Sequence, residues 1–214
     1  MRFQAYFFDF DGTIGATEVD IRASWLAALD HFGLPKEPFY QHFQIGPTPL
    51  ESIAMLYPDM PLDRRKMFFE TYKSLHDDAE HYLARPYPGI AAMLQKLHQA
   101  GKKIYIVTNK RYKPLYKLVR QFGFAQYIDG LFVPDIIDID PEKHLKKSDS
   151  LTLAMRVAGV SAEESLMVGD TAIDITVGKS NRTMTCAVTW GYGSYESLKA
   201  SSPDYLIDHP KELP

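Results

Sequence analysis

The chain has 214 residues, of which 45% are hydrophobic and 24% are charged. That balance is typical of a soluble globular protein and argues against disorder, and the length suits one domain, or one domain with a modest insertion. The formal net charge is −3 and no run of like charges suggests a nucleic-acid-binding or lipid-binding tail, so we expect neither a nucleic-acid partner nor a membrane partner.

Short apolar runs recur along the chain and predict the buried strands of a sheet. Segments with helical spacing lie between most of these runs, and two of them stop at Gly101 and at Gly159. Strands that alternate with helices predict an α/β fold, a doubly wound parallel sheet with a Rossmann-like core. The predicted strands are residues 3–8, 103–107, 131–133, 165–168, 184–188 and 204–207.

One long segment interrupts this alternation. Residues 19–83 contain no strand-like run, whereas a connection between two elements usually needs only about 4–6 residues. The segment instead shows helical patterns at residues 21–32, 49–57 and 62–83.

An inserted all-helical cap domain explains this segment. We predict that the cap comprises residues 15–84 and that the catalytic α/β core domain comprises residues 1–14 and 85–214. Residues 85–89 are rich in proline and form, with residues 12–16, the predicted hinge.

Cys186 is the only cysteine, so it cannot form an internal disulfide. It lies in an apolar run, where a small buried side chain fits. The apolar stretch at the N-terminus is too short for a signal peptide, and no segment approaches the about 20 apolar residues that cross a bilayer. We therefore expect a cytoplasmic protein.

Two acids, Asp9 and Asp11, directly follow the first predicted strand. In an extended chain, residues two apart point to the same side, and the carboxyl ends of parallel strands are where such sheets bind ligands. Two adjacent carboxylates repel each other, and a hard divalent cation such as Mg²⁺ would neutralise them. An ordinary Asp-Gly turn at Asp11 and Gly12 is the alternative.

Two other predicted strands also end in polar residues. Thr108 and Asn109 follow the strand at residues 103–107, and both offer groups that bind the oxygens of an anion. Asp170 and Asp174 follow the strand at residues 165–168, with a spacing that puts both acids on one face of a helix.

In this order, the sequences Asp-Phe-Asp-Gly-Thr, Val-Thr-Asn and Gly-Asp-Thr-x-x-Asp closely resemble three motifs of the haloacid dehalogenase superfamily, in its phosphatase branch. Lys147 fits the family's remaining motif, a lysine ahead of a helix, and Lys146 is the alternative. The resemblance covers nearly the whole chain, and residues 187–207 are especially similar to the phosphoglycolate phosphatase group.

The resemblance implies a Mg²⁺-dependent phosphatase that forms an aspartyl-phosphate and acts on a small phosphorylated metabolite. It implies that Asp9 is the nucleophile and that Asp11 is the general acid and base. The remaining implied roles are metal binding by Asp9, the Asp11 carbonyl and Asp170, phosphate binding by Gly12, Thr108, Asn109 and Lys147, and support by Thr13 for Asp11 and by Asp174 for Lys147 or a metal-bound water.

The sequence also departs from the family pattern at two places. Ala16 stands where relatives often have an acid at the cap hinge, which leaves the substrate open. Ser148 follows Lys147 where many members have proline, which leaves the choice between Lys146 and Lys147 open.

Several alternatives to a phosphomonoesterase remain. A sugar-phosphate mutase or a pyrophosphatase would use the same scaffold, although residues 44–50 of the cap lack the basic side chains that a bisphosphorylated intermediate would need. Within these residues, Gly46 to Thr48 either close over the phosphate or cap a helix. A phosphate-accepting receiver and a non-catalytic regulator are alternatives of another class. The sequence does not indicate an oligomeric state.

Overall fold

The computed structural model describes residues 2–135 and 146–214. It contains a six-stranded sheet whose neighbouring strands all run parallel, in the order β5-β4-β1-β6-β7-β8. This arrangement confirms the predicted doubly wound α/β fold. The strands are β1 (Ala5–Phe8), β4 (Lys103–Val107), β5 (Gly130–Phe132), β6 (Ser165–Gly169), β7 (Met184–Val188) and β8 (Tyr205–Ile207).

Strand β1 lies inside the sheet, between β4 and β6. All four of its residues are buried, so it has a continuous apolar run instead of an alternating pattern. The register places Phe8 opposite Ile106 of β4 and Val168 of β6, so the three strands end side by side. The residues that follow them therefore meet at the carboxyl edge of the sheet, where open α/β sheets bind ligands.

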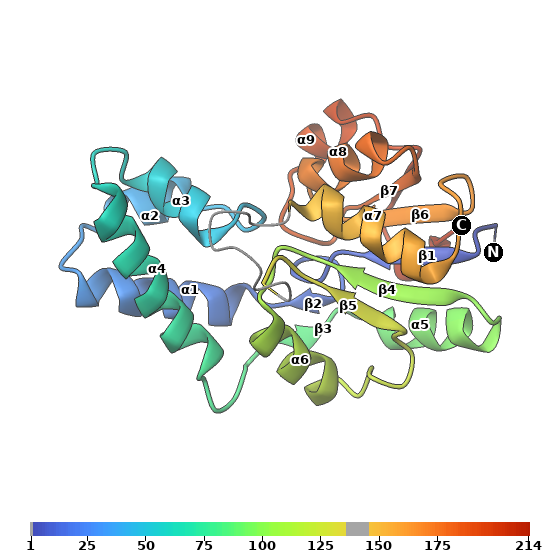
Figure 1. The fold of residues 1–214 in the computed structure, drawn as a ribbon, viewed down its shortest axis with the longest axis horizontal. Helices are drawn as coiled ribbons and strands as arrows, with labels where there is room; N and C mark the ends of the chain where they lie inside the picture. Colours follow the sequence, from blue (N-terminus) through green and yellow to red (C-terminus); the bar gives the residue numbers. More distant parts are fainter. Residues whose placement is uncertain (1, 136–145) are drawn as a thin grey trace. The chain divides into compact units, whose positions relative to one another are not determined.

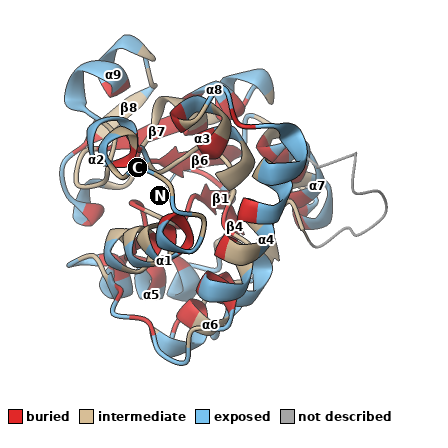
Figure 2. Cartoon of the chain, turned by 90° about the vertical axis from the view of Figure 1, so that its left-hand side faces the viewer, coloured by how far each residue is buried: buried red, intermediate tan, exposed pale blue. Residues whose placement is uncertain are grey.

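Helices cover both faces of the sheet, with α5 and α6 on one side and α7 and α8 on the other (Figure 1). Figure 2 shows the buried strands between helices whose outer faces are exposed. Within the described residues, no helix is long and apolar enough to cross a membrane. The helices in the same part of the chain as the parallel sheet are α5 (Ile90–Gln99), α6 (Tyr112–Gln121), α7 (Lys147–Ala158), α8 (Ala172–Ser180), α9 (Tyr195–Ala200) and the short 3-10 helix Pro210–Glu212.

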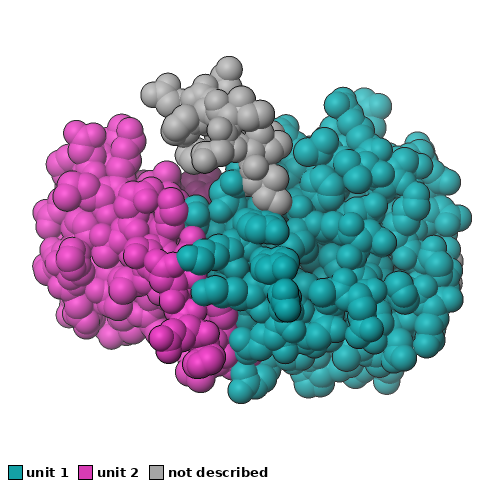
Figure 3. Space-filling view, turned by 60° about the horizontal axis from the view of Figure 1, so that its bottom comes forward, with its two compact units in different colours: residues 1–16, 85–214 teal, residues 17–84 magenta. Residues whose placement is uncertain are grey.

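The chain divides into two compact units, one formed by residues 1–16 and 85–214 and the other by residues 17–84 (Figure 3). The second unit is helical, and its core surrounds the buried ring of Trp25. The rings of Phe39, Phe43, Phe68 and Tyr72 all pack against that of Trp25. Its helices are α1 (Glu18–His31), α2 (Glu37–His42), α3 (Pro49–Leu56) and α4 (Leu62–Asp77).

Helix α4 ends earlier than the predicted helix at residues 62–83. It stops at Asp77, and residues 83 and 84 then reach the first turn of α1. The Asp20 carboxylate of α1 accepts hydrogen bonds from the N–H groups of Leu83 and Ala84, both 2.8 Å long. These two N–H groups therefore bind a side chain and do not need the backbone carbonyls that a longer α4 would supply.

Thr48 caps helix α3. Its side chain accepts a hydrogen bond from the N–H of Glu51, and the Glu51 carboxylate accepts one from the N–H of Thr48, so the two form a capping box. This is the helix-capping role that the sequence offers for the end of the Gly46 to Thr48 loop.

Two short strands join the predicted hinge segments. Strands β2 (Gly15–Ala16) and β3 (Arg85–Pro86) pair antiparallel, with Gly15 opposite Pro86 and Ala16 opposite Arg85. Both strands belong to the unit that contains the parallel sheet. The chain thus leaves and re-enters that unit at adjacent positions, directly after the loop that carries Asp9 and Asp11.

Candidate active site

Three predicted site residues directly follow neighbouring parallel strands. Asp9 follows β1, Thr108 follows β4 and Asp170 follows β6. The register of the three strands brings these positions to one edge of the sheet. Asp174 reaches the same edge from the first turn of α8.

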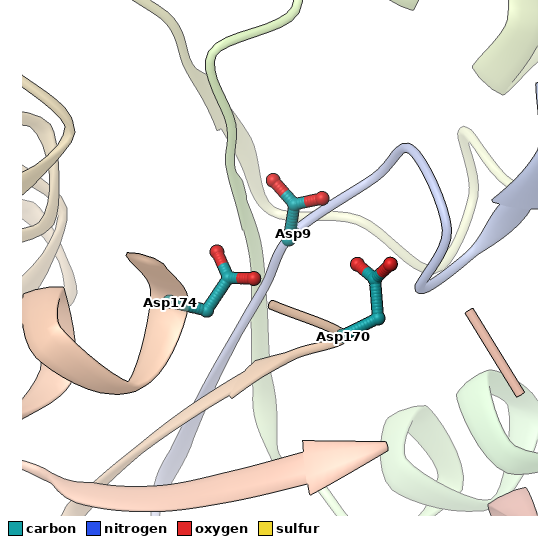
Figure 4. Close-up of side chains that lie close together, drawn as sticks. All are labelled: Asp9, Asp170 and Asp174. Carbon is teal, nitrogen blue, oxygen red and sulfur yellow. The ribbon is translucent and has the colours of Figure 1, made fainter. Parts of the chain in front are cut away.

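The carboxyl groups of Asp9, Asp170 and Asp174 form one buried cluster. One carboxylate oxygen from each lies within 4.8 Å of those of the other two. Figure 4 shows the three side chains side by side, on the ends of β1 and β6 and on α8. Oxygen donors this close and this well buried suit a hard divalent cation, because unneutralised carboxylates would repel one another.

Lys147 is the positively charged partner of this cluster. It is the first residue of α7, and its ammonium group forms ion pairs with Asp9 Oδ1 and with Asp174 Oδ1, the latter 2.6 Å away. Lys146 is the exposed residue that precedes the helix, and its backbone N–H donates to Asp149. The structure thus brings Lys147 to the acids from the first turn of α7.

Burial shifts the ionisation of the cluster. It raises the pKa of Asp9 well above its ordinary value, although the Lys147 charge acts against this, and together with the Asp174 charge it raises the pKa of Asp170 to about 7. Burial alone would lower the pKa of Lys147, but the charges of Asp174 and Asp9 outweigh it and raise that pKa. One lysine therefore faces three acids, and the cluster has an excess of negative charge when they ionise.

Backbone and side-chain donors fix the carboxylate of Asp170. The hydroxyl of Thr13 donates to Asp170 Oδ1 at 3.0 Å, and the N–H of Tyr192 donates to Oδ2 at 2.7 Å. A Cβ on Gly191 would overlap the Asp170 side chain and the carbonyl oxygen of Gly12, so only glycine fits there. The structure thus shows Thr13 bound to Asp170, while its implied support for Asp11 stays a prediction.

The loop after β1 needs glycine at its fourth residue, Gly12. Gly12 has a φ of 86°, which L side chains rarely adopt, and a Cβ there would overlap the Asp170 carboxylate. The indole N–H of Trp190 donates to the carbonyl of Thr13 at 3.0 Å and holds the loop from the other end. The sequence places residues 190–193 after a strand but does not reveal these contacts.

Asp11 pairs with a residue that the sequence analysis did not select. The ammonium of Lys110 lies 3.0 Å from Asp11 Oδ1 and 3.3 Å from Oδ2. Lys110 follows Thr108 and Asn109 directly, and its N–H donates to the buried hydroxyl oxygen of Thr108 at 3.2 Å. Asn109 is half-buried beside them. The position of Lys110 after the Val-Thr-Asn motif was the available signal, but the sequence alone does not show its burial.

The comparisons with known proteins point to one family. A family model described as haloacid dehalogenase-like hydrolase matches residues 6–188. A phosphoglycolate phosphatase from Vibrio parahaemolyticus is 30% identical over 214 residues, which cover 96% of this chain and 92% of the relative. The pyrophosphatase PpaX from Bacillus velezensis is 28% identical over 215 residues, covering 99% and 95%.

Solved structures share the fold over nearly the whole chain. A haloacid dehalogenase-like family hydrolase from Streptococcus pneumoniae superimposes with a TM-score of 0.84 at 24% identity, covering 99% of this chain and 96% of the other. A hydrolase from Pseudomonas syringae gives a TM-score of 0.81 at 18% identity, covering 99% and 95%. At these identities the likeness concerns the fold alone.

Proposed function

The chain belongs to the haloacid dehalogenase-like hydrolase family, and we propose that it is a Mg²⁺-dependent phosphatase that hydrolyses a small phosphomonoester through an aspartyl-phosphate on Asp9. The observation that carries this proposal is the buried cluster of Asp9, Asp170 and Asp174 with Lys147 at the carboxyl edge of the sheet. The family resemblance and the phosphatase relatives support it.

The acidic cluster fits Mg²⁺ by the chemistry of its donors, which are carboxylate oxygens in a buried site with excess negative charge. In this proposal the carboxylates of Asp9 and Asp170 and the backbone carbonyl of Asp11 hold the ion, while Asp174 orients Lys147. When bound, the ion neutralises charge on the phosphoryl oxygens.

The first step is an attack by a carboxylate oxygen of Asp9 on phosphorus. The bond from phosphorus to the ester oxygen breaks, and the leaving oxygen takes a proton from the carboxyl group of Asp11. Thr108, Asn109, Lys147 and the backbone at Gly12 bind the phosphate oxygens, because phosphoryl transfer depends mainly on positioning and charge neutralisation.

The second step releases phosphate. Asp11, now a carboxylate, accepts a proton from a water molecule as that water attacks the phosphorus of the aspartyl-phosphate. The bond from phosphorus to the Asp9 oxygen breaks, Asp9 returns as a carboxylate, and the proton on Asp11 restores the starting state. A halide leaving group needs no proton, so Asp11 favours phosphate esters over halogenated acids as substrates.

Inorganic pyrophosphate is the second candidate substrate. Relatives nearly as similar to this chain as the phosphoglycolate phosphatase, at 30% identity, are pyrophosphatases, for instance those from Bacillus velezensis at 28% and Halalkalibacterium halodurans at 29%. The two functions share the attack by Asp9 and differ only in whether the leaving oxygen belongs to an alcohol or to a second phosphate.

A substrate panel tests the proposal. We expect small monophosphates, with phosphoglycolate first, to give a higher kcat/KM with Mg²⁺ than pyrophosphate, hexose bisphosphates, nucleotides or a phosphopeptide. A preference for pyrophosphate would select the second candidate. Isomerisation of a hexose phosphate without phosphate release would indicate a mutase, and no phosphate release from any compound would favour a receiver or a non-catalytic regulator.

Mg²⁺ should stabilise the protein more at pH 8 than at pH 5. The pKa of Asp170 is about 7 in the folded protein, against about 4 in an unfolded chain, so between these values the folded state binds more protons. Without metal, this group's contribution to the free energy of unfolding therefore falls as the pH rises from about 4 to about 7. A metal ion that needs the carboxylate gains affinity over the same range.

Thermal denaturation with and without Mg²⁺ measures this effect. The gain in Tm from Mg²⁺ should be larger at pH 8 than at pH 5, and Asp170→Asn should reduce the difference, because an amide does not titrate and only Asp9 then contributes to it. An equal gain at both pH values in the wild type would show that Mg²⁺ does not bind at these acids.

A further inference from the structure

Lys110 is a buried lysine that the reaction described above does not use. It lies between β4 and α6, only 3% of its side-chain surface is exposed, and its ammonium group lies against the carboxylate of Asp11. Asp11 is also well covered, with 13% of its side chain exposed. Taking an ammonium out of water costs free energy unless partners compensate it, and the Asp11 carboxylate is a counter-ion for this lysine.

The backbone of Lys110 is tied to the other side of the site. Its N–H donates to the hydroxyl oxygen of Thr108, and Thr108 is itself held to β5 through its N–H, which donates to the carbonyl of Phe132 at 3.2 Å. Lys110 therefore links the end of β4, which carries a proposed phosphate-binding residue, to Asp11 in the loop after β1. A change at Lys110 would act on the orientation of Asp11 first.

The two oxygens of Asp11 differ in their contacts. Oδ2 accepts a hydrogen bond from Lys110 at 3.3 Å. Oδ1 is buried and lies 3.0 Å from the same ammonium group, but within the part of the chain that the structure describes it receives no hydrogen bond. Both oxygens of the carboxyl group thus lie within 3.3 Å of the Lys110 ammonium, which fixes the position of the group.

We propose that Lys110 is a positioning residue that holds the carboxyl group of Asp11 for proton transfer with the leaving oxygen, and this rests on the proposed phosphatase function. Lys110 does not take part in the covalent steps. Because a misplacement of about 1 Å can cost about 10²-fold in rate, a lysine that only orients the proton donor can have a large effect.

The leaving-group dependence of kcat/KM tests this role. A nitrophenolate leaves without help from an acid, whereas the alkoxide of an alkyl phosphate needs a proton. For Lys110→Met we expect a loss of about 10–100-fold on an alkyl phosphate such as phosphoglycolate and of less than about threefold on 4-nitrophenyl phosphate. Since kcat/KM reports only the steps up to departure of the leaving group, the later hydrolysis of the aspartyl-phosphate does not affect it.

Three controls make this result specific. Asp11→Asn should show the same ranking of substrates with a larger loss, and adding Lys110→Met to it should cost little more, since both act through one carboxyl group. Lys96→Met, on the exposed face of α5, should match the wild type on all substrates. Lys110→Arg keeps the charge and should show the same ranking of substrates, with a smaller loss of kcat/KM. This variant provides the test if Lys110→Met does not fold.

Uniform losses on all leaving groups would overturn the proposal, because they indicate a structural role or a direct contact with the phosphate. A weaker inhibition by inorganic phosphate in Lys110→Met would identify the direct contact and also overturn it. These results leave the proposed function intact as long as the wild type releases phosphate. If the wild type hydrolyses no phosphomonoester, the proposed function fails, and this role for Lys110 fails with it.

Discussion

Asp9→Asn is expected to abolish turnover, with a loss of at least about 10⁴-fold in kcat, because an amide is not a competent nucleophile at phosphorus. The substitution keeps the shape of the side chain and removes one negative charge from the buried cluster. Phosphate release under saturating Mg²⁺ and substrate measures the loss, and no phosphorylated form of the variant should be trapped by a rapid acid quench.

The folding of this variant is the control. Burial raises the pKa of Asp9, so asparagine avoids the cost of burying an ionised carboxylate, and Lys147 keeps its ion pair with Asp174. We therefore expect Asp9→Asn to keep the circular dichroism spectrum of the wild type and a comparable Tm at pH 8 without metal. Recovery of a phosphorylated peptide from this variant would place the nucleophile at another residue.

Lys147→Met should reduce both activity and stability. The ammonium pairs with Asp9 and Asp174 inside the protein, and removing one partner of a buried ion pair typically costs about 3–5 kcal/mol, because it leaves buried charge uncompensated. Because the variant also lacks a charged donor to the phosphoryl oxygens, its kcat should be about 10²–10³-fold lower than that of the wild type.

The fall in Tm caused by Lys147→Met should depend on pH. At pH 8 without metal the acids repel one another most, so the fall in Tm should be largest there. At pH 5, below its pKa of about 7, Asp170 holds a proton, and the raised pKa of Asp9 favours its protonated form, so the fall should be smaller. Lys146→Met is the matched control, since this side chain lies one residue away and is exposed. If Lys146→Met lost activity and Lys147→Met did not, the phosphate-binding lysine would be Lys146.

The sequence predicts the inner strands of the sheet well because nearly all of their residues are buried. Strands β4 and β7 have the predicted bounds, residues 103–107 and 184–188, since four of the five residues in each are buried between polar or glycine-containing turns. The run at residues 3–8 predicts β1 too long, because Phe3 and Gln4 precede the strand, which begins at Ala5. An apolar run predicts which residues are buried. Phe3 is buried although it lies outside the hydrogen-bonded strand.

The helical unit was harder to predict in detail. Helix α2 has only six residues, which is too short for a periodic pattern, and it was not predicted. The end of α4 depends on Asp20, which lies far away in the sequence and accepts hydrogen bonds from residues 83 and 84. Contacts of this kind are made by the tertiary structure, so the local sequence does not reveal them.

In the candidate site, too, the local sequence predicts some features and only the tertiary structure shows the others. Asp9, Thr108 and Asp170 could be placed at one edge because each directly follows a buried parallel strand. The N–H of Tyr192, which donates to Asp170, is a backbone group, so the residue type at this position does not predict the hydrogen bond. Lys110 is one lysine among many basic residues, and only the structure shows that it is buried against Asp11.

The most direct test of the central claim is phosphate release from 4-nitrophenyl phosphate by the wild-type protein, with Mg²⁺, then with excess chelator, and then with Mg²⁺ restored. Our account predicts turnover with Mg²⁺, loss of turnover in chelator and recovery on adding the ion back, because three buried acids face one lysine at the reacting edge. Full activity in excess chelator, or no turnover with Mg²⁺, would contradict it.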